Sequence, residues 1–226
     1  MANVNGITKK IHFIWIVDNS LNKKEVAAVV NGLTRMAEKI KSLTGIDYDI
    51  KNIPANYSGA GTTIRSYTFL SGELKKAADN QIAIFVLNKR VYGRGTSQLF
   101  GHQNTDRFTN KNPARATVIL NLDLIRRNSR NENDIEKLVY WFGIHEVGHV
   151  FGIAGKHEYR IKNETAAYDK KTGEHCVVPV CNMVSERNYG KAADFAIKNS
   201  RAKRIHCKWC LAEWKAYPNI LDKLGK

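Results

Sequence analysis

Four cysteines, the only ones in this chain of 226 residues, all lie after residue 175. They form two short-spaced pairs: Cys176 with Cys181, a C-x4-C, and Cys207 with Cys210, a C-x2-C. Residues 1–10 are polar and lack the apolar run of a secretion signal, so we expect a cytoplasmic location, where disulfides are disfavoured. Two such pairs joined by a loop are the usual layout of a four-cysteine zinc site. A redox dithiol at C-x2-C is a weaker alternative, because no strand–helix–strand pattern surrounds it.

The composition is close to that of an average globular chain, with 43% hydrophobic and 25% charged residues. It excludes a mainly disordered or collagen-like protein. No apolar run approaches the ~20 residues that a membrane span needs, so no membrane partner is expected. The net charge is +15, and its densest basic stretch is residues 187–208, in which Asp194 is the only acidic residue. This stretch suggests an anionic partner, although a solvated basic face is the simpler explanation.

Apolar patterning predicts alternating strands and helices over the first part of the chain. Strands are expected at 11–17, 46–54, 81–87 and 116–122, a short strand at 97–102, and helices at 22–45 and 63–78. Asn22 followed by Glu25 marks a helix start, and Gly45 marks its end. The order predicts an α+β fold with an α/β-like N-terminal layer and a mixed sheet.

A long helix is expected next, capped by Asn131 or Asn133 and ending near Gly152. Beyond it the pattern weakens: 153–175 is loop-like, and 176–210 is irregular apart from a helix at 191–199, with a closing helix at 211–224. We therefore divide the chain into an N-terminal subdomain, 1–152, and a smaller irregular C-terminal subdomain, 153–226, stabilised by zinc.

The long helix carries an H-E-x-x-H motif, His145-Glu146-Val147-Gly148-His149. Two histidines four residues apart on a helix project the same way and can hold one Zn2+. Glu146 can then take a proton from zinc-bound water without binding the metal. Two core-facing histidines on an apolar helix are the structural alternative. Gly152, three residues after the motif, allows a sharp turn that could return a third ligand.

With these residues the chain resembles the archaemetzincins, zinc metallopeptidases of the metzincin clan. Their signature is H-E-x-x-H-x-x-G-x-x-H-C, then four residues, C-x-M, and later C-x-x-C. This chain has the first part through Gly152, then His175-Cys176, Cys181-Asn182-Met183 and finally Cys207 with Cys210. It departs from the signature by 22 residues between Gly152 and His175, where the family has two, and by a longer stretch of 23 between Met183 and Cys207.

The resemblance implies a metzincin-like fold and two zinc ions per chain. His145, His149 and His175 would hold the catalytic ion, Glu146 would be the general base, and Met183 would support the histidines from beneath. Cys176, Cys181, Cys207 and Cys210 would hold the structural ion. The family spacing places the third histidine at 155, which is Gly155 here. His157 is the alternative, in a charged context between Lys156 and Glu158.

Other residues are weaker candidates. Glu164 and Glu174 could supply a carboxylate ligand, and His206 could replace a cysteine. His102 lies on a strand that could pair with an extended peptide, whereas His12 is expected to be structural. The sequence thus predicts a zinc-dependent metallopeptidase acting on peptides or proteins. The alternative is a non-catalytic zinc protein that binds nucleic acid or another polyanion through its basic C-terminal region. The sequence does not indicate an oligomeric state.

Overall fold

The computed structural model describes residues 10–55, 63–78, 81–93, 97–106, 115–153, 168–169, 175–176, 178–179, 181–184, 188–202 and 205–224. Its main sheet has five strands: β1 Ile11–Asp18, β2 Tyr48–Ala55, β4 Gln81–Leu87, β6 Gly101–Asp106 and β7 Arg115–Asn121. Two-stranded pairs are formed by β3 Thr63–Arg65 with β5 Arg90–Tyr92, and by β8 Tyr168–Asp169 with β9 His175–Cys176. The helices are α1 Lys23–Thr44, α2 Ser66–Leu74, α3 Leu122–Arg127, α4 Glu132–Val150, α5 Tyr189–Asn199 and α6 Lys208–Leu224.

The sheet is mixed, as predicted. Its strand order is β2-β1-β4-β7-β6, and the first four strands are parallel. The last strand, β6, is antiparallel to β7 and forms an edge, with Gly101 opposite Leu120. Pro54 lies in β2, the other edge strand, where the missing N–H of a proline is tolerated.

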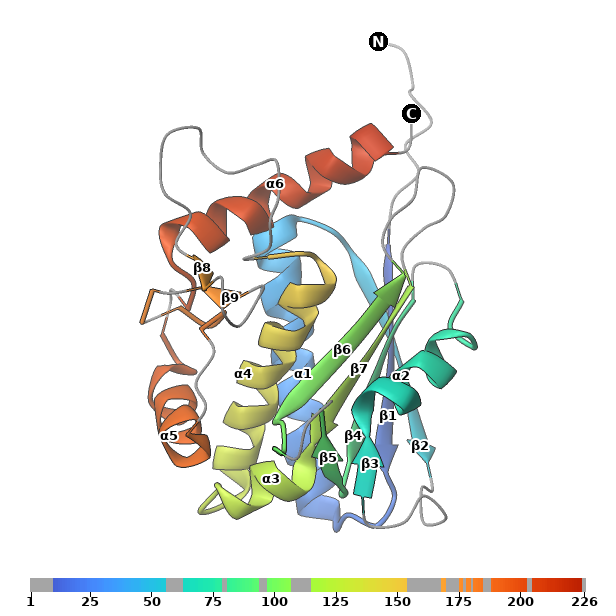
Figure 1. Cartoon of the computed structure of the whole chain (residues 1–226), viewed down its shortest axis with the longest axis vertical. Helices are drawn as coiled ribbons and strands as arrows, with labels where there is room; N and C mark the ends of the chain where they lie inside the picture. Colours follow the sequence, from blue (N-terminus) through green and yellow to red (C-terminus); the bar gives the residue numbers. More distant parts are fainter. Residues whose placement is uncertain are drawn as a thin grey trace.

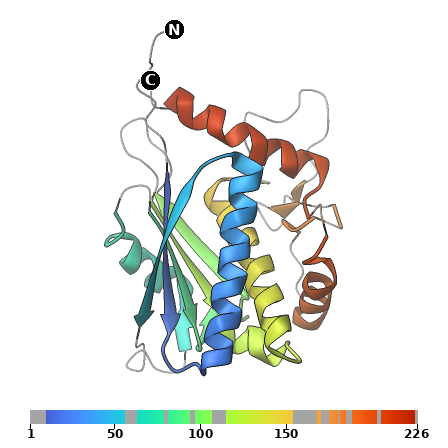
Figure 2. The ribbon, with the colours of Figure 1, turned by 180° about the vertical axis from the view of Figure 1, so that it is seen from behind.

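Helices cover both faces of the sheet (Figures 1 and 2). α1 and α4 pack side by side on one face, and α2 packs on β6 and β7 from the other. Apolar side chains alternate along β1 to serve both faces: Phe13 and Trp15 join the core under α1 and α4, whereas Ile14 packs on the core under α2. α4 thus packs between α1 and the side of the sheet formed by β6 and β7.

The C-terminal residues lie against α4 and α1. α5 packs on α4, and α6 crosses the end of α1 (Figure 1). Met183 and Trp214 are fully buried in the same apolar cluster as the sheet residues under α4. The division at residues 152 and 153 stays a prediction, and this cluster contains residues from both sides of it.

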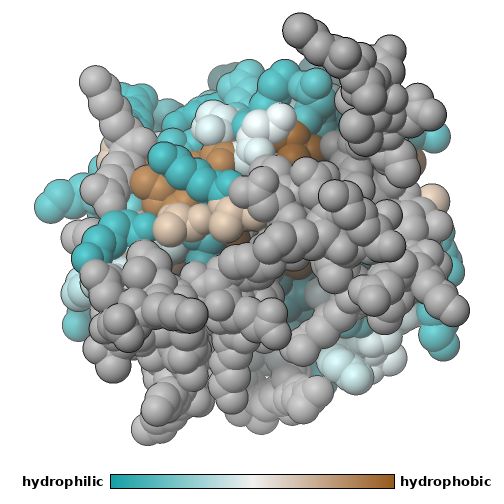
Figure 3. All heavy atoms as spheres, turned by 90° about the horizontal axis from the view of Figure 1, so that it is seen from above, coloured by the Kyte–Doolittle hydropathy of each residue, from teal (hydrophilic) through white to brown (hydrophobic). Residues whose placement is uncertain are grey.

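The described helices include none long and apolar enough to cross a membrane. On the upper face, apolar side chains of the described residues lie among polar ones (Figure 3).

Candidate active site and metal centres

Both ends of α4 are capped by specific residues. Asn131 is its N-cap and accepts a hydrogen bond from the Asp134 amide at 3.1 Å. At the other end Gly152 takes a left-handed φ of 71°. The backbone N–H of Gly152 donates to the His149 carbonyl, and the backbone N–H of Ile153 donates to the Gly148 carbonyl. These two bonds form a Schellman turn. The sharp turn predicted at Gly152 is therefore present.

Three imidazoles converge at this end of α4. His145 and His149 lie one turn apart on the helix, and His175 reaches them from β9. The ring centroids of His175 lie 5.2 Å from His145 and 4.7 Å from His149. The Nε2 atoms of His145 and His149 are 3.1 Å apart. Nitrogen ligands on one tetrahedral zinc lie about 3.3 Å apart, so this spacing fits a shared ion.

Burial keeps the two helix histidines neutral, the form that binds metal. It lowers the pKa of His145 to about 4, with a further contribution from His175, and lowers the pKa of His149 well below its ordinary value. Burial also raises the pKa of Glu146 to about 8. A divalent cation next to this carboxyl would favour its charged form. The donor set therefore suits a cation, and a bound cation would lower the pKa of the carboxyl beside it.

Close contacts leave little room around Glu146 and below the histidines. A Cβ on Gly101 of β6 would lie 2.5 Å from Cγ of Glu146, so only a glycine lets the edge strand approach the carboxyl this closely. A Cβ on Gly148 would lie 2.6 Å from Sδ of Met183. Met183 thus packs directly beneath the helix turn that carries both histidines.

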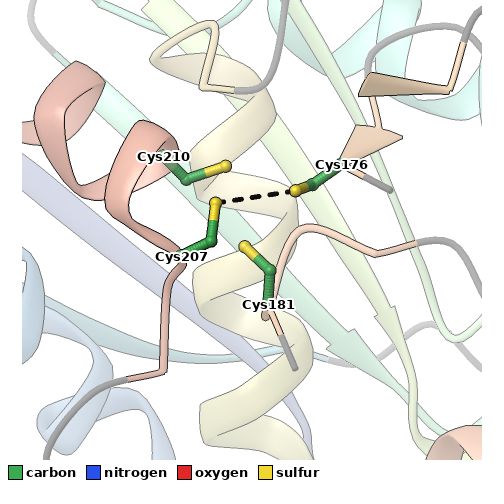
Figure 4. Close-up of side chains that lie close together, drawn as sticks. All are labelled: Cys176, Cys181, Cys207 and Cys210. Carbon is green, nitrogen blue, oxygen red and sulfur yellow. Dashed lines mark hydrogen bonds between the residues drawn. The ribbon is translucent and has the colours of Figure 1, made fainter. Parts of the chain in front are cut away.

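Four thiols form a second cluster (Figure 4), in which Cys176 directly follows His175 of the first cluster in sequence. Cys176 comes from β9 and Cys181 from the loop after it, whereas Cys207 directly precedes α6 and Cys210 lies in its first turn. All four are buried and none is in a disulfide. The Sγ atoms of Cys176 and Cys207 lie 3.7 Å apart, close to the about 3.8 Å between thiolates on one tetrahedral zinc. The hydrogen bond with Cys176 lowers the pKa of the Cys207 thiol, whereas bonds within the same cluster raise the pKa of Cys181 and Cys210. All four would be thiolates only next to a bound cation.

The remaining described histidines considered as candidates contact residues outside the two clusters. The Ser66 hydroxyl donates to the Tyr92 carbonyl, and its oxygen lies 2.7 Å from Nδ1 of His102. His206 is buried, and its Nε2 accepts a hydrogen bond from the Trp214 indole. His12 lies 2.8 Å from Asp49 across β1 and β2. His157, Glu164 and Glu174 lie outside the described residues.

Sequence reasoning missed Asn182, as well as Gly101 and Gly148. The backbone carbonyl of Asn182 lies 2.7 Å from Nδ1 of His145. His145 therefore donates Nδ1–H to that carbonyl and keeps Nε2 as the free donor atom. Nothing in the sequence marks a residue that acts through its main-chain oxygen. Gly148 did carry a signal, because a glycine inside a helix often has a packing reason.

No protein-family model matches the chain, and no curated protein matches it by sequence. Solved structures do match by fold. Archaemetzincin from Methanopyrus kandleri superimposes with a TM-score of 0.57 at 15% identity, over 95% of this chain and 98% of that one. A zinc-dependent peptidase from Methanocorpusculum labreanum does so with a TM-score of 0.54 at 15% identity, over 91% and 100%. The predicted α+β, metzincin-like architecture is confirmed: this chain has the fold of an archaemetzincin.

Proposed function

We propose that this protein is a zinc-dependent metallopeptidase that hydrolyses peptide bonds. The observation that carries the proposal is the group of three imidazoles, two of them buried, with the buried Glu146 beside it at the edge strand β6. The fold supports it, since one protein that shares the fold is named a zinc-dependent peptidase.

His145, His149 and His175 would hold the catalytic zinc, and the four cysteines would hold a structural one, which makes two ions per chain. Bound zinc would supply Lewis-acid polarisation of the scissile carbonyl and a lowered pKa for water at the metal. The chain's own residues prepare that site. The Asn182 carbonyl holds the proton of His145 on Nδ1, and burial keeps His145 and His149 neutral.

Glu146 would be the general base. Its carboxylate would accept a proton from water during attack and return it to the leaving amine. Its neighbour β6 is an edge strand of the sheet that the described residues form, and an extended peptide could add along it as a further strand. Gly101 would then place the peptide backbone close to the carboxylate.

The basic stretch at 187–208 and a cytoplasmic location complete the proposal. A reducing compartment would keep four thiols available as ligands. An anionic partner for the basic stretch would show as binding that weakens with salt. If nucleic-acid binding is found and peptide cleavage is not, the non-catalytic alternative replaces the peptidase.

The decisive test is Glu146→Ala. Cleavage of a mixed peptide library, detected as new termini by mass spectrometry, should fall ~10²–10⁴-fold, the usual effect of losing a general base. Zinc content should stay at the wild-type level, because Glu146 is no ligand. Glu132→Gln is the matched control, since Glu132 is an exposed residue on the same helix. Full activity in Glu146→Ala would refute a mechanism with Glu146 as general base. Loss of zinc in this variant would show that Glu146 is a metal ligand instead.

The third ligand is tested by a pair of variants. His175→Ala should remove the catalytic zinc while the four-cysteine zinc remains, as measured by elemental analysis. His157→Ala should leave both ions in place. The reverse result would assign the third ligand to His157.

A further inference from the structure

The ligands of the two sites are interleaved along the chain. His175 of the histidine site is followed directly by Cys176 of the cysteine site. Cys181 is followed by Asn182, whose carbonyl orients His145. Each short segment therefore carries one cysteine ligand and one group that acts on the histidine site.

The two segments are also bonded to each other. The Cys176 amide donates to the Met183 carbonyl at 2.9 Å, and Cys176 bridges Val184 in parallel. A metal ion bound by Cys176 and Cys181 would hold both segments at their cysteines. It would thereby limit the movement of the neighbouring His175 and Asn182 backbones.

Asn182 links these segments to α4 through its side chain. Its amide Nδ2 donates to the Trp141 carbonyl at 2.9 Å, one helical turn before His145. The backbone N–H of Asn182 donates to the Ile205 carbonyl at 2.7 Å, two residues before Cys207. The side chain is almost fully buried, and its Oδ1 has no hydrogen-bond partner among the described residues. An unpaired buried acceptor is unfavourable, so the orientation of this amide is set by its bond to α4.

We infer that Asn182 is a positioning residue that couples the two sites, so that metal in the four-cysteine site strengthens metal binding in the three-histidine site. The physical basis is conformational entropy. A His145 ring that a fixed carbonyl already orients loses less conformational freedom when it binds metal. The inference rests on the proposed function only in treating the three histidines as a metal site.

Cobalt titration of the metal-free, reduced protein tests this inference. Thiolate ligands give Co2+ charge-transfer absorption that imidazole ligands lack, so the two sites can be followed separately. In Asn182→Ala, the Kd of the histidine site should rise about 10–100-fold, the usual effect of losing a partner that orients a ligand. The Kd of the cysteine site should change less than threefold.

Asn199→Ala is the matched control. The Asn199 amide also donates to a helix carbonyl, that of Phe195 at 2.8 Å, but on α5. It should change neither Kd. An unchanged histidine site in Asn182→Ala would overturn the inference, and so would an equal weakening of both sites, which would indicate a general loss of structure.

Reciprocity gives a second test that does not depend on Asn182. Coupling between two binding sites must be equal in both directions. Cys210→Ser, with the cysteine site impaired, should weaken Co2+ binding by the histidines. His149→Ala should weaken retention of Co2+ by the thiolates against a chelator by the same factor, relative to wild type with both sites filled. If Cys210→Ser does not fold, His149→Ala still decides, because unchanged retention there would exclude coupling.

These measurements are independent of catalysis. A protein that shows the coupling but cleaves no peptide would retain this inference and lose the proposed peptidase function. A protein that cleaves peptides but binds the two ions independently would do the opposite.

Discussion

The sheet with its helices, residues 10–153, and the C-terminal segment, residues 175–224, reach a buried interior by different means. The sheet buries long apolar strands between α1 and α4 on one side and α2 on the other. The described part of the C-terminal segment has one two-residue strand and two helices, and its buried residues include all four cysteines. The first region is rich in hydrophobic burial, and we expect the second, with four thiols among its buried residues, to depend on bound metal as well.

Metal removal should separate the two regions most strongly. Structural zinc contributes about 10–16 kcal/mol in isolated zinc-finger peptides, so its loss should exceed any single substitution. In the chelated protein, hydrogen exchange should accelerate at least 100-fold over residues 175–202. Exchange in β1, β4 and β7 should stay near its original rate. Equal acceleration in both regions would show that the cysteine site supports the whole molecule.

A core substitution in the sheet should have the complementary effect. Ile84 in β4 is fully buried, and Ile84→Ala should lower the free energy of unfolding by about 2–5 kcal/mol in denaturant titrations. Metal content should not change. Ile50→Ala is the control, because 38% of Ile50 is exposed. Loss of zinc in folded Ile84→Ala would contradict the separation of the two regions.

Gly101→Ala tests the point at which the sheet enters the site. The new Cβ would displace the Glu146 side chain, and a shift of about 1 Å at a catalytic group can lower kcat ~10²-fold. Zinc content and unfolding temperature should change little. Gly72→Ala is the control, since a Cβ there meets nothing within 4 Å. A wild-type kcat in Gly101→Ala would show that the close approach of β6 to Glu146 does not matter for catalysis.

The smallest expected effect concerns the start of α4. Burial alone would raise the pKa of Asp134, but hydrogen bonds from Arg130 and Lys137 lower it below its ordinary value of about 4. The charged carboxylate therefore stabilises the fold above pH about 4, and this contribution is lost as the pH falls through the lowered pKa.

Asp134→Asn should destabilise the protein by about 0.5–1 kcal/mol at pH 7 and by progressively less below pH about 4. The measurement is denaturant unfolding of metal-free protein, so that metal loss in acid does not enter the difference. A difference that stays constant with pH would show that the charge of Asp134 is unimportant.

Local signals predicted the long helices well. The capping box of Asn22 and Glu25 and the left-handed Gly45 define α1, and Asn131 caps α4, one of the two asparagines considered. Strands that depend on distant partners were placed less well. The helix predicted over 63–78 is a short strand, β3, followed by α2, because residues 63–65 pair with β5. No local sequence pattern predicts that residues 63–65 pair with a strand so far along the chain.

Of the other errors, one has the same origin and one is local. The strand predicted at 97–102 lies at 101–106, where pairing with β7 sets the register of a polar segment. The helix α3 was not predicted, because Asn121 reads as the end of a strand although its side chain also caps Leu124. In the site, the H-E-x-x-H helix is a local pattern and was found. The meeting of His175 with His145 and His149 followed only from the family resemblance, since the residues are distant in sequence.

The Schellman turn at Gly152 and the pairing of Cys176 with Met183 hold the chain on both sides of the long insert. The entropy cost of closing a loop grows with the logarithm of its length, by about 0.6 kcal/mol for each doubling. The number of residues between such anchors can therefore change greatly during evolution while the ligand after it keeps its place. A sequence search that counts forward from His149 would miss His175. A search that counts back eight residues from Met183 would find it.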